Sequence, residues 1–187
     1  MSSGIISVRY AKALISYANE LGVAESLYKE MLKLSDMLKN IPNWRAVVLN
    51  PTINKDLKIK FIESLLLNND KSVSSTMSKF LKLVFSAGRG ELLLFMTENY
   101  IKMYRDMNNI LKTWLITAHP VGSNIKERVS KLVYNVCNGT VEWSEKIDES
   151  IQGGFILIVD GFMFDASVKT TLERVKKEIV EKNKRKI

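Results

Sequence analysis

The stretch Ile151-Gln-Gly-Gly-Phe-Ile-Leu-Ile-Val-Asp-Gly-Phe-Met-Phe-Asp-Ala-Ser-Val-Lys-Thr-Thr-Leu172 decides the second half of the fold. Its apolar run 155–159 has the length of a strand, and Asp160-Gly161 separates that run from a second one, 162–164. This arrangement is typical of a two-residue hairpin turn, because glycine accepts a positive φ without steric cost. Asp165 and Ser167 then stand where a helix can be capped. The stretch therefore predicts a buried hairpin that leads into a helix.

Outward from this stretch, the C-terminal half alternates between strand and helix patterns. Thr, Trp and Ile residues favour an extended chain over 110–118, and residues 141–147 alternate as in a strand. Residues 123–136 have helical spacing, and the final helix runs to about residue 184. The predicted order is β-α-β-β-β-α, a small sheet covered by two helices.

The N-terminal half has helical spacing throughout. Glycine, proline and asparagine positions divide it into six predicted helices, over residues 5–21, 24–38, 42–48, 54–66, 72–87 and 91–107. Six helices with short connections predict a compact bundle. The pattern changes at residues 106–109, so we expect an α+β chain with domains at 1–107 and 108–187 and a basic tail at 182–187.

The first predicted helix is more apolar than one buried stripe requires. Its polar residues fall within about 100° of arc, and apolar residues cover both remaining sides. One of these sides carries Tyr10, Ala13 and Tyr17. Either this is a central helix of the bundle, or one side packs against the core and the other receives a partner helix.

Composition excludes several classes of protein. The chain has 187 residues, 46% of them apolar, which allows a substantial core. No stretch approaches the ~20 apolar residues of a membrane span, and no signal-peptide pattern is visible. Cys137 is the only cysteine, so an internal disulfide is excluded. The formal charge of +8 includes four cations in the last six residues, which leaves a basic nucleic-acid-associated protein as one alternative.

A search for catalytic chemistry finds weak patterns only. Gly153-Gly154 precedes a strand, whereas a phosphate-binding glycine loop leads into a helix N-terminus. Asp165 and Ser167 could belong to a nucleophilic site, but His119 is the only histidine and no nucleophile-elbow pattern surrounds Ser167. We therefore expect no catalytic residue, metal site or cofactor. An enzyme using Asp165 and Ser167 remains the second alternative to an interaction protein.

Three groups of residues along the chain form motifs that belong together. Val8-Arg-Tyr-Ala-Lys-Ala-Leu14 lies in the first predicted helix, and Leu83-Val-Phe-Ser-Ala-Gly-Arg-Gly90 spans the turn between the fifth and sixth. The most specific cluster comprises Gly153, Gly154, Asp160, Gly161, Asp165, Ser167 and Leu172. These motifs resemble those of one family, the δ subunit of F-type ATP synthases, called the oligomycin-sensitivity-conferring protein in mitochondria. Glu149, Ala166 and Val175 depart from the family pattern, and Ala166 stands where glycine is common.

The resemblance implies a non-catalytic subunit of the peripheral stalk. Residues 1–107 would bind the catalytic head and hold the N-terminal helix of an α subunit between helices one and five, while residues 108–187 would bind the C-terminal end of the b subunit. The stalk resists rotation of the head while an ion gradient drives ATP synthesis. The implied location is peripheral, on the cytoplasmic face of the bacterial plasma membrane, with no nucleic-acid partner.

This implied role gives the apolar first helix a use. We expect Tyr10, Ala13 and Tyr17 to line the groove for the α-subunit helix. The fifth helix would contribute its other wall, through Leu81, Leu83 and Phe85 or through its opposite flank.

Overall fold

The computed structural model describes residues 3–67, 73–120 and 139–184, together with single positions at 122, 127, 131 and 134. The chain divides into two compact units, residues 1–107 and 108–187. It combines helices with one four-stranded sheet. Most of the helix predicted over residues 123–136 lies outside the described residues, as do residues 185–187 of the tail.

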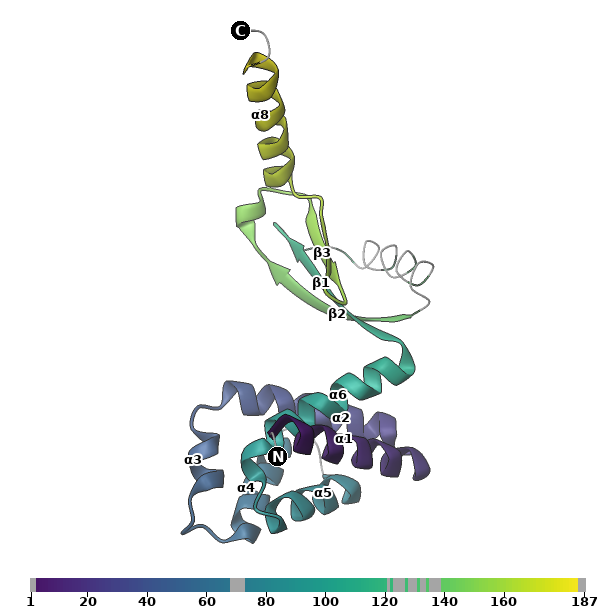
Figure 1. The fold of residues 1–187 in the computed structure, drawn as a ribbon, viewed down its shortest axis with the longest axis vertical. Coiled ribbons are helices and arrows are strands. Elements are labelled where there is room, and N and C mark those ends of the chain that lie inside the picture. The colour runs from purple at the N-terminus through teal and green to yellow at the C-terminus, as the bar shows by residue number, and fades with distance from the viewer. Residues whose placement is uncertain are drawn as a thin grey trace. The chain divides into compact units, whose positions relative to one another are not determined.

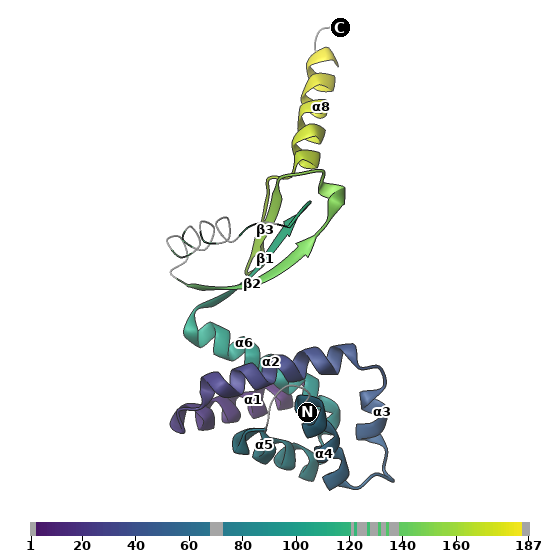
Figure 2. The same ribbon diagram turned by 180° about the vertical axis from the view of Figure 1, so that it is seen from behind.

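The first unit is helical, and Figures 1 and 2 show α1 lying beside α2. Its elements are α1 (Ser3–Glu20), α2 (Ala24–Asn40), α3 (Trp44–Leu49), α4 (Lys55–Leu66), α5 (Ser75–Ser86), the 3-10 turn η1 (Gly90–Leu92) and α6 (Leu93–Asn108). Backbone hydrogen bonds cap several helix ends. At the start of α5, the Ser74 hydroxyl accepts from the Met77 amide and serves as the N-cap.

Apolar side chains from all six of these helices form the core of the first unit. The α2 stripe at helical spacing, Leu27, Met31, Leu34 and Leu38, is buried as the pattern predicts. From α1 the core receives one side only, including Ala11, Leu14 and Ala18. The opposite side of α1 keeps Ala13 exposed, and Tyr17 is 37% exposed. The sequence pattern of two apolar sides therefore corresponds to one buried side and one open side.

The second unit is built on a sheet with the strand order β2-β1-β3-β4. The strands are β1 (Ile110–Thr117), β2 (Thr140–Ile147), β3 (Phe155–Val159) and β4 (Phe162–Asp165), and the short turn η2 (Glu149–Ile151) precedes β3. β1 pairs with β2 in parallel and with β3 in antiparallel register, where Leu115 lies opposite Leu157. Alternate β1 residues, Thr113, Leu115 and Thr117, are buried on one face.

The predicted hairpin forms, but the expectation that it is buried is wrong: no residue of β3 or β4 is fully buried. β3 and β4 pair antiparallel, and the turn residues Asp160 and Gly161 have φ values of +46° and +90°. β4 is an edge strand that exposes Phe162, Met163 and Phe164, at 84%, 66% and 61% of their surfaces. Helix α8 (Val168–Lys184) follows it, but the expectation that this helix covers the sheet is wrong, because its apolar residues Leu172, Val175 and Ile179 are 56%, 44% and 54% exposed.

Candidate functional site

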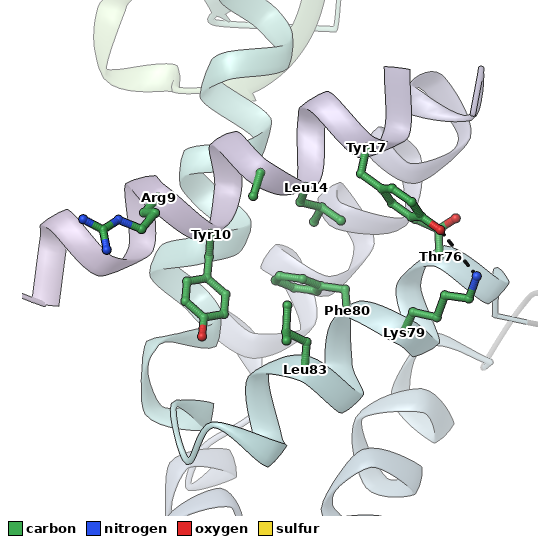
Figure 3. A pocket seen from close by; sticks show the side chains of 9 residues that line it. Arg9, Tyr10, Leu14, Tyr17, Thr76, Lys79, Phe80 and Leu83 are labelled. Carbon is green, nitrogen blue, oxygen red and sulfur yellow. Dashed lines mark hydrogen bonds between the residues drawn. The ribbon is translucent and has the colours of Figure 1, made fainter. Parts of the chain in front are cut away.

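A cavity of about 440 Å³ opens between α1 and α5 in the first unit (Figure 3). Its α1 wall consists of residues spaced three and four apart, which places them on one face of that helix. Its α5 wall repeats the same spacing. The lining residues are Arg9, Tyr10, Ala13, Leu14 and Tyr17 of α1, and Thr76, Lys79, Phe80 and Leu83 of α5. Two helix faces, each about two turns long, therefore form a groove, which we call the α1–α5 groove.

Four of the six residues expected in such a groove line it. Tyr10, Ala13 and Tyr17 lie on its α1 wall, and Leu83, which is 56% exposed, lies on its α5 wall. The structure thus brings together side chains that are more than sixty positions apart in the sequence.

Leu81 and Phe85 do not line the groove, because they point to the opposite flank of α5. Leu81 is fully buried, and Phe85 is only 4% exposed. The ring of Phe85 fills the space beside Gly90, where an added Cβ would lie 2.7 Å from Phe85 Cε1. Both residues belong to the core stripe of α5 and hold the helix in place.

The actual α5 wall of the groove contains Thr76, Lys79 and Phe80, which the sequence reasoning did not select. These residues lie seven, four and three positions before Leu83, so helical spacing from Leu83 alone leads to them.

Cations from the α5 side hold the two tyrosines of the α1 wall. Arg89, in the turn after α5, donates from Nη1 to the Tyr10 hydroxyl at 2.8 Å, and its guanidinium lies 5.2 Å from the ring centroid. Lys79 Nζ donates to the Tyr17 hydroxyl at 3.4 Å, as the dashed line in Figure 3 shows. These contacts connect the two walls at two places and leave the apolar middle of the groove open.

Four residues of the C-terminal motif cluster lie together with Ala166 in what we call the glycine junction: Gly153, Gly154, Asp165, Ala166 and Ser167. The other three lie elsewhere, Asp160 and Gly161 in the β3–β4 turn and Leu172 exposed on α8. The Ala166 amide donates to the Phe155 carbonyl at 2.9 Å, and the Val168 amide donates to the Gly153 carbonyl at 3.0 Å. Gly154 has a φ of +72°, and a Cβ on it would collide with the carbonyl oxygen of Ala166. Both glycines are needed so that the start of α8 can lie directly against the chain leading into β3.

The polar residues of the glycine junction cap α8. The Ser167 hydroxyl accepts from the Thr170 amide at 3.2 Å, and Ser167 is 2% exposed. Asp165 accepts from the Ser167 amide and from the Thr170 hydroxyl, each at 2.8 Å. These hydrogen bonds, above all the one from the Ser167 backbone, hold the pKa of the Asp165 carboxyl below its usual value. Ala166 has no positive φ, so alanine fits where the family often has glycine.

The structure gives no support to the catalytic alternative based on Asp165 and Ser167. Both side chains are hydrogen-bonded to the first turn of α8, where the Ser167 hydroxyl accepts from the Thr170 amide as a helix cap does. Within the described ranges, no three His, Cys, Asp or Glu side chains gather as a metal site would require. Over the same ranges, no helix has the length and apolarity needed to cross a bilayer.

Comparisons with known proteins give one consistent result. Residues 6–179 match the family described as ATP synthase delta (OSCP) subunit. The chain is 37% identical over 185 residues to the ATP synthase subunit delta of Phocaeicola vulgatus, with 99% of each chain covered. It is 36% identical over 185 residues to the protein of the same name from Bacteroides thetaiotaomicron, again with 99% of each covered. None of these matches supports a nucleic-acid-associated protein.

The fold is also shared with a solved structure. A chain in the cryo-EM structure of the Toxoplasma gondii mitochondrial ATP synthase hexamer aligns with a TM-score of 0.64 and 21% identity, over 93% of this chain and 97% of that one. The similarity at this identity concerns the fold. The family match over nearly the full length and the 37% identity to a relative show that this chain belongs to the ATP synthase delta (OSCP) subunit family, a non-catalytic component of the ATP synthase.

Proposed function

We propose that this peripheral-stalk subunit holds the N-terminal helix of an ATP synthase α subunit in the α1–α5 groove. In this proposal residues 1–107 form a six-helix bundle that sits on the catalytic head. Residues 108–187, with the order β-α-β-β-β-α, bind the C-terminal end of the b subunit. The subunit then works on the cytoplasmic face of a bacterial membrane, connected to it through the complex.

The observation that carries the proposal is the shape and chemistry of the groove. Its walls are two helix faces of about two turns each, and Leu14, Phe80 and Leu83 form its middle. Ala13, which also lines the groove, lies on α1 between Tyr10 and Tyr17. An amphipathic helix docks by laying its own apolar stripe, at positions i, i+3, i+4 and i+7, into such a groove. The groove therefore matches a helical partner better than it matches a compact small molecule.

A charge placed in the groove tests the proposal. Ala13→Glu puts a carboxylate where the partner's apolar stripe would lie, and burying it unpaired is costly. We expect binding of a synthetic peptide of the first ~20 residues of the same organism's α subunit to weaken at least about tenfold, measured by calorimetry.

Ser16→Glu is the matched control, since Ser16 is exposed on α1 and does not line the groove. It adds the same charge to the same helix and should leave the affinity unchanged. Equal affinity of Ala13→Glu and wild type, with the helical circular dichroism intact, would overturn the assignment of the groove.

A further inference from the structure

The two ends of the α1–α5 groove carry positive charge. Figure 3 shows Arg9 and Lys79 at opposite ends of the pocket, with Leu14, Phe80 and Leu83 between them. None of the nine lining residues is acidic. We propose that the helix bound in this groove carries two acidic residues, two helical turns apart, that pair with Arg9 and Lys79. This inference rests on the proposed function and specifies the chemistry of the partner.

Both cations are available for such pairing. Arg9 and Lys79 are exposed, and among the described residues neither forms a salt bridge with a carboxylate. Lys79 is held by a neutral oxygen, the Tyr17 hydroxyl, at 3.4 Å. Because an ammonium group has three donors, Lys79 can keep that hydrogen bond and also donate to a carboxylate of the partner. Arg89, in contrast, is engaged with both the hydroxyl and the ring of Tyr10.

The spacing of the two acidic residues follows from α1. Arg9 and Tyr17, the contact of Lys79, are eight residues apart, which corresponds to about 12 Å along the helix axis. A docked helix that lies along the groove covers this distance in about two turns. Acidic residues at i and i+7 therefore reach both cations, whereas acidic residues at i and i+3 reach only one end at a time.

The charges and the apolar middle have different effects on binding. The apolar contacts with Phe80 and Leu83 favour any helix with a suitable stripe. Charge pairs at the ends fix the register of the docked helix and reject a helix with basic residues at these positions. Arg9 and Lys79 are thus specificity-determining residues of the groove.

Three synthetic helical peptides with the same apolar stripe test the spacing. The first has Glu at i and i+7, the second has Glu at i and i+3, and the third has Gln at i and i+7. We expect the first to bind about tenfold more tightly than the third at about 0.1 M salt, because each exposed charge pair contributes about threefold. The advantage should disappear at about 1 M salt. Equal affinities of the three peptides would overturn the inference.

Matched neutral variants of the protein test the two cations. We expect Lys79→Gln and Arg9→Gln each to weaken the i, i+7 Glu peptide about threefold more than they weaken the Gln peptide. The controls are Lys82→Gln on α5 and Lys12→Gln on α1, exposed residues that do not line the groove. If the controls lose as much affinity for the i, i+7 Glu peptide, the peptide is attracted by the net charge of the protein, and specific pairing with Arg9 and Lys79 is wrong.

The α-subunit peptide separates this inference from the proposed function. If that peptide does not bind the wild-type protein, the proposed function fails. If it binds and its affinity is the same in Arg9→Gln and Lys79→Gln, the groove assignment stands and the acidic pairing alone is wrong.

Discussion

The α1–α5 groove and the glycine junction each consist of a few residues, but side chains play opposite roles in them. The groove presents side chains that the fold does not need, such as Ala13 and the largely exposed Leu83. The junction depends on missing side chains and on backbone hydrogen bonds, as at Gly153 and Gly154. The residues of the glycine junction therefore maintain the fold, while the proposed binding surface consists of ordinary helical residues. Four experiments test this contrast, from the largest expected effect to the smallest.

The first experiment compares two leucines on opposite flanks of α5. Leu81→Ala removes a fully buried side chain and should lower the free energy of unfolding by about 2–5 kcal/mol. Leu83→Ala should change it by less than about 0.5 kcal/mol, because Leu83 is 56% exposed, while weakening the α-subunit peptide. Urea unfolding followed by circular dichroism, with calorimetry of peptide binding, measures both. A large loss of stability in Leu83→Ala would contradict the separation of core and groove.

The second experiment adds one methyl group at the glycine junction. Gly154→Ala combines a positive φ with a collision against the Ala166 carbonyl, so we expect a loss of at least about 2 kcal/mol in the stability of the second unit. Tryptophan fluorescence during urea unfolding, in a Trp44→Phe background, reports on Trp114 and Trp143 in that unit. Gly161→Ala is the control, because its φ is +90° but no atom lies near the added Cβ. A loss of stability in Gly161→Ala as large as that in Gly154→Ala would contradict the role of the close approach between Gly154 and the Ala166 carbonyl.

The third experiment removes the cap of α8. Ser167→Ala should destabilise the second unit by about 1 kcal/mol, since the Thr170 amide loses its acceptor. Ser167→Thr keeps a hydroxyl at this position and should restore most of the stability in the same unfolding assay. Binding of the α-subunit peptide should be unchanged in both variants. If Ser167→Ala also loses peptide binding, the glycine junction does not act on the fold alone, and the contrast with the α1–α5 groove is wrong.

The fourth experiment uses pH. Because the pKa of Asp165 is lowered in the folded state, its hydrogen bonds contribute stability above the ordinary Asp pKa of about 4. That contribution is lost as the pH falls through the lower folded-state pKa. The stability difference between wild type and Asp165→Asn should therefore shrink between about pH 6 and pH 3 in urea titrations. A constant difference over this range would show that the carboxylate charge is not involved.

The sequence predicted much of the fold because several elements have strong local signals. Asp160-Gly161 between two apolar runs specified the β3–β4 hairpin, which the structure confirms. The last helix begins one residue after Ser167, as its capping role requires. The parallel pairing of β1 with β2 was not predicted, because it joins strands separated by more than twenty residues and has no local signal.

Each wall of the groove was anticipated only in part: the α1 wall through Tyr10, Ala13 and Tyr17 but without Arg9 and Leu14, and the α5 wall through Leu83 alone. In α1 the polar residues fill one narrow arc, so the excess apolar side with Tyr10, Ala13 and Tyr17 was visible in the sequence. In α5 both flanks are apolar, and periodicity alone does not say which flank faces the core. The structure resolves this through tertiary packing: Leu81 lies in the core, and Leu83 lies in the groove.

The exposed edge strand β4 has a consequence for the protein before assembly. An edge strand offers unpaired backbone groups to another chain, and here it also carries the exposed side chains Phe162, Met163 and Phe164. Such an edge favours self-association as the concentration rises. We therefore expect the isolated chain to aggregate more readily than a Met163→Lys variant, in which a charge interrupts the apolar edge. A subunit with this edge benefits from joining its complex soon after synthesis.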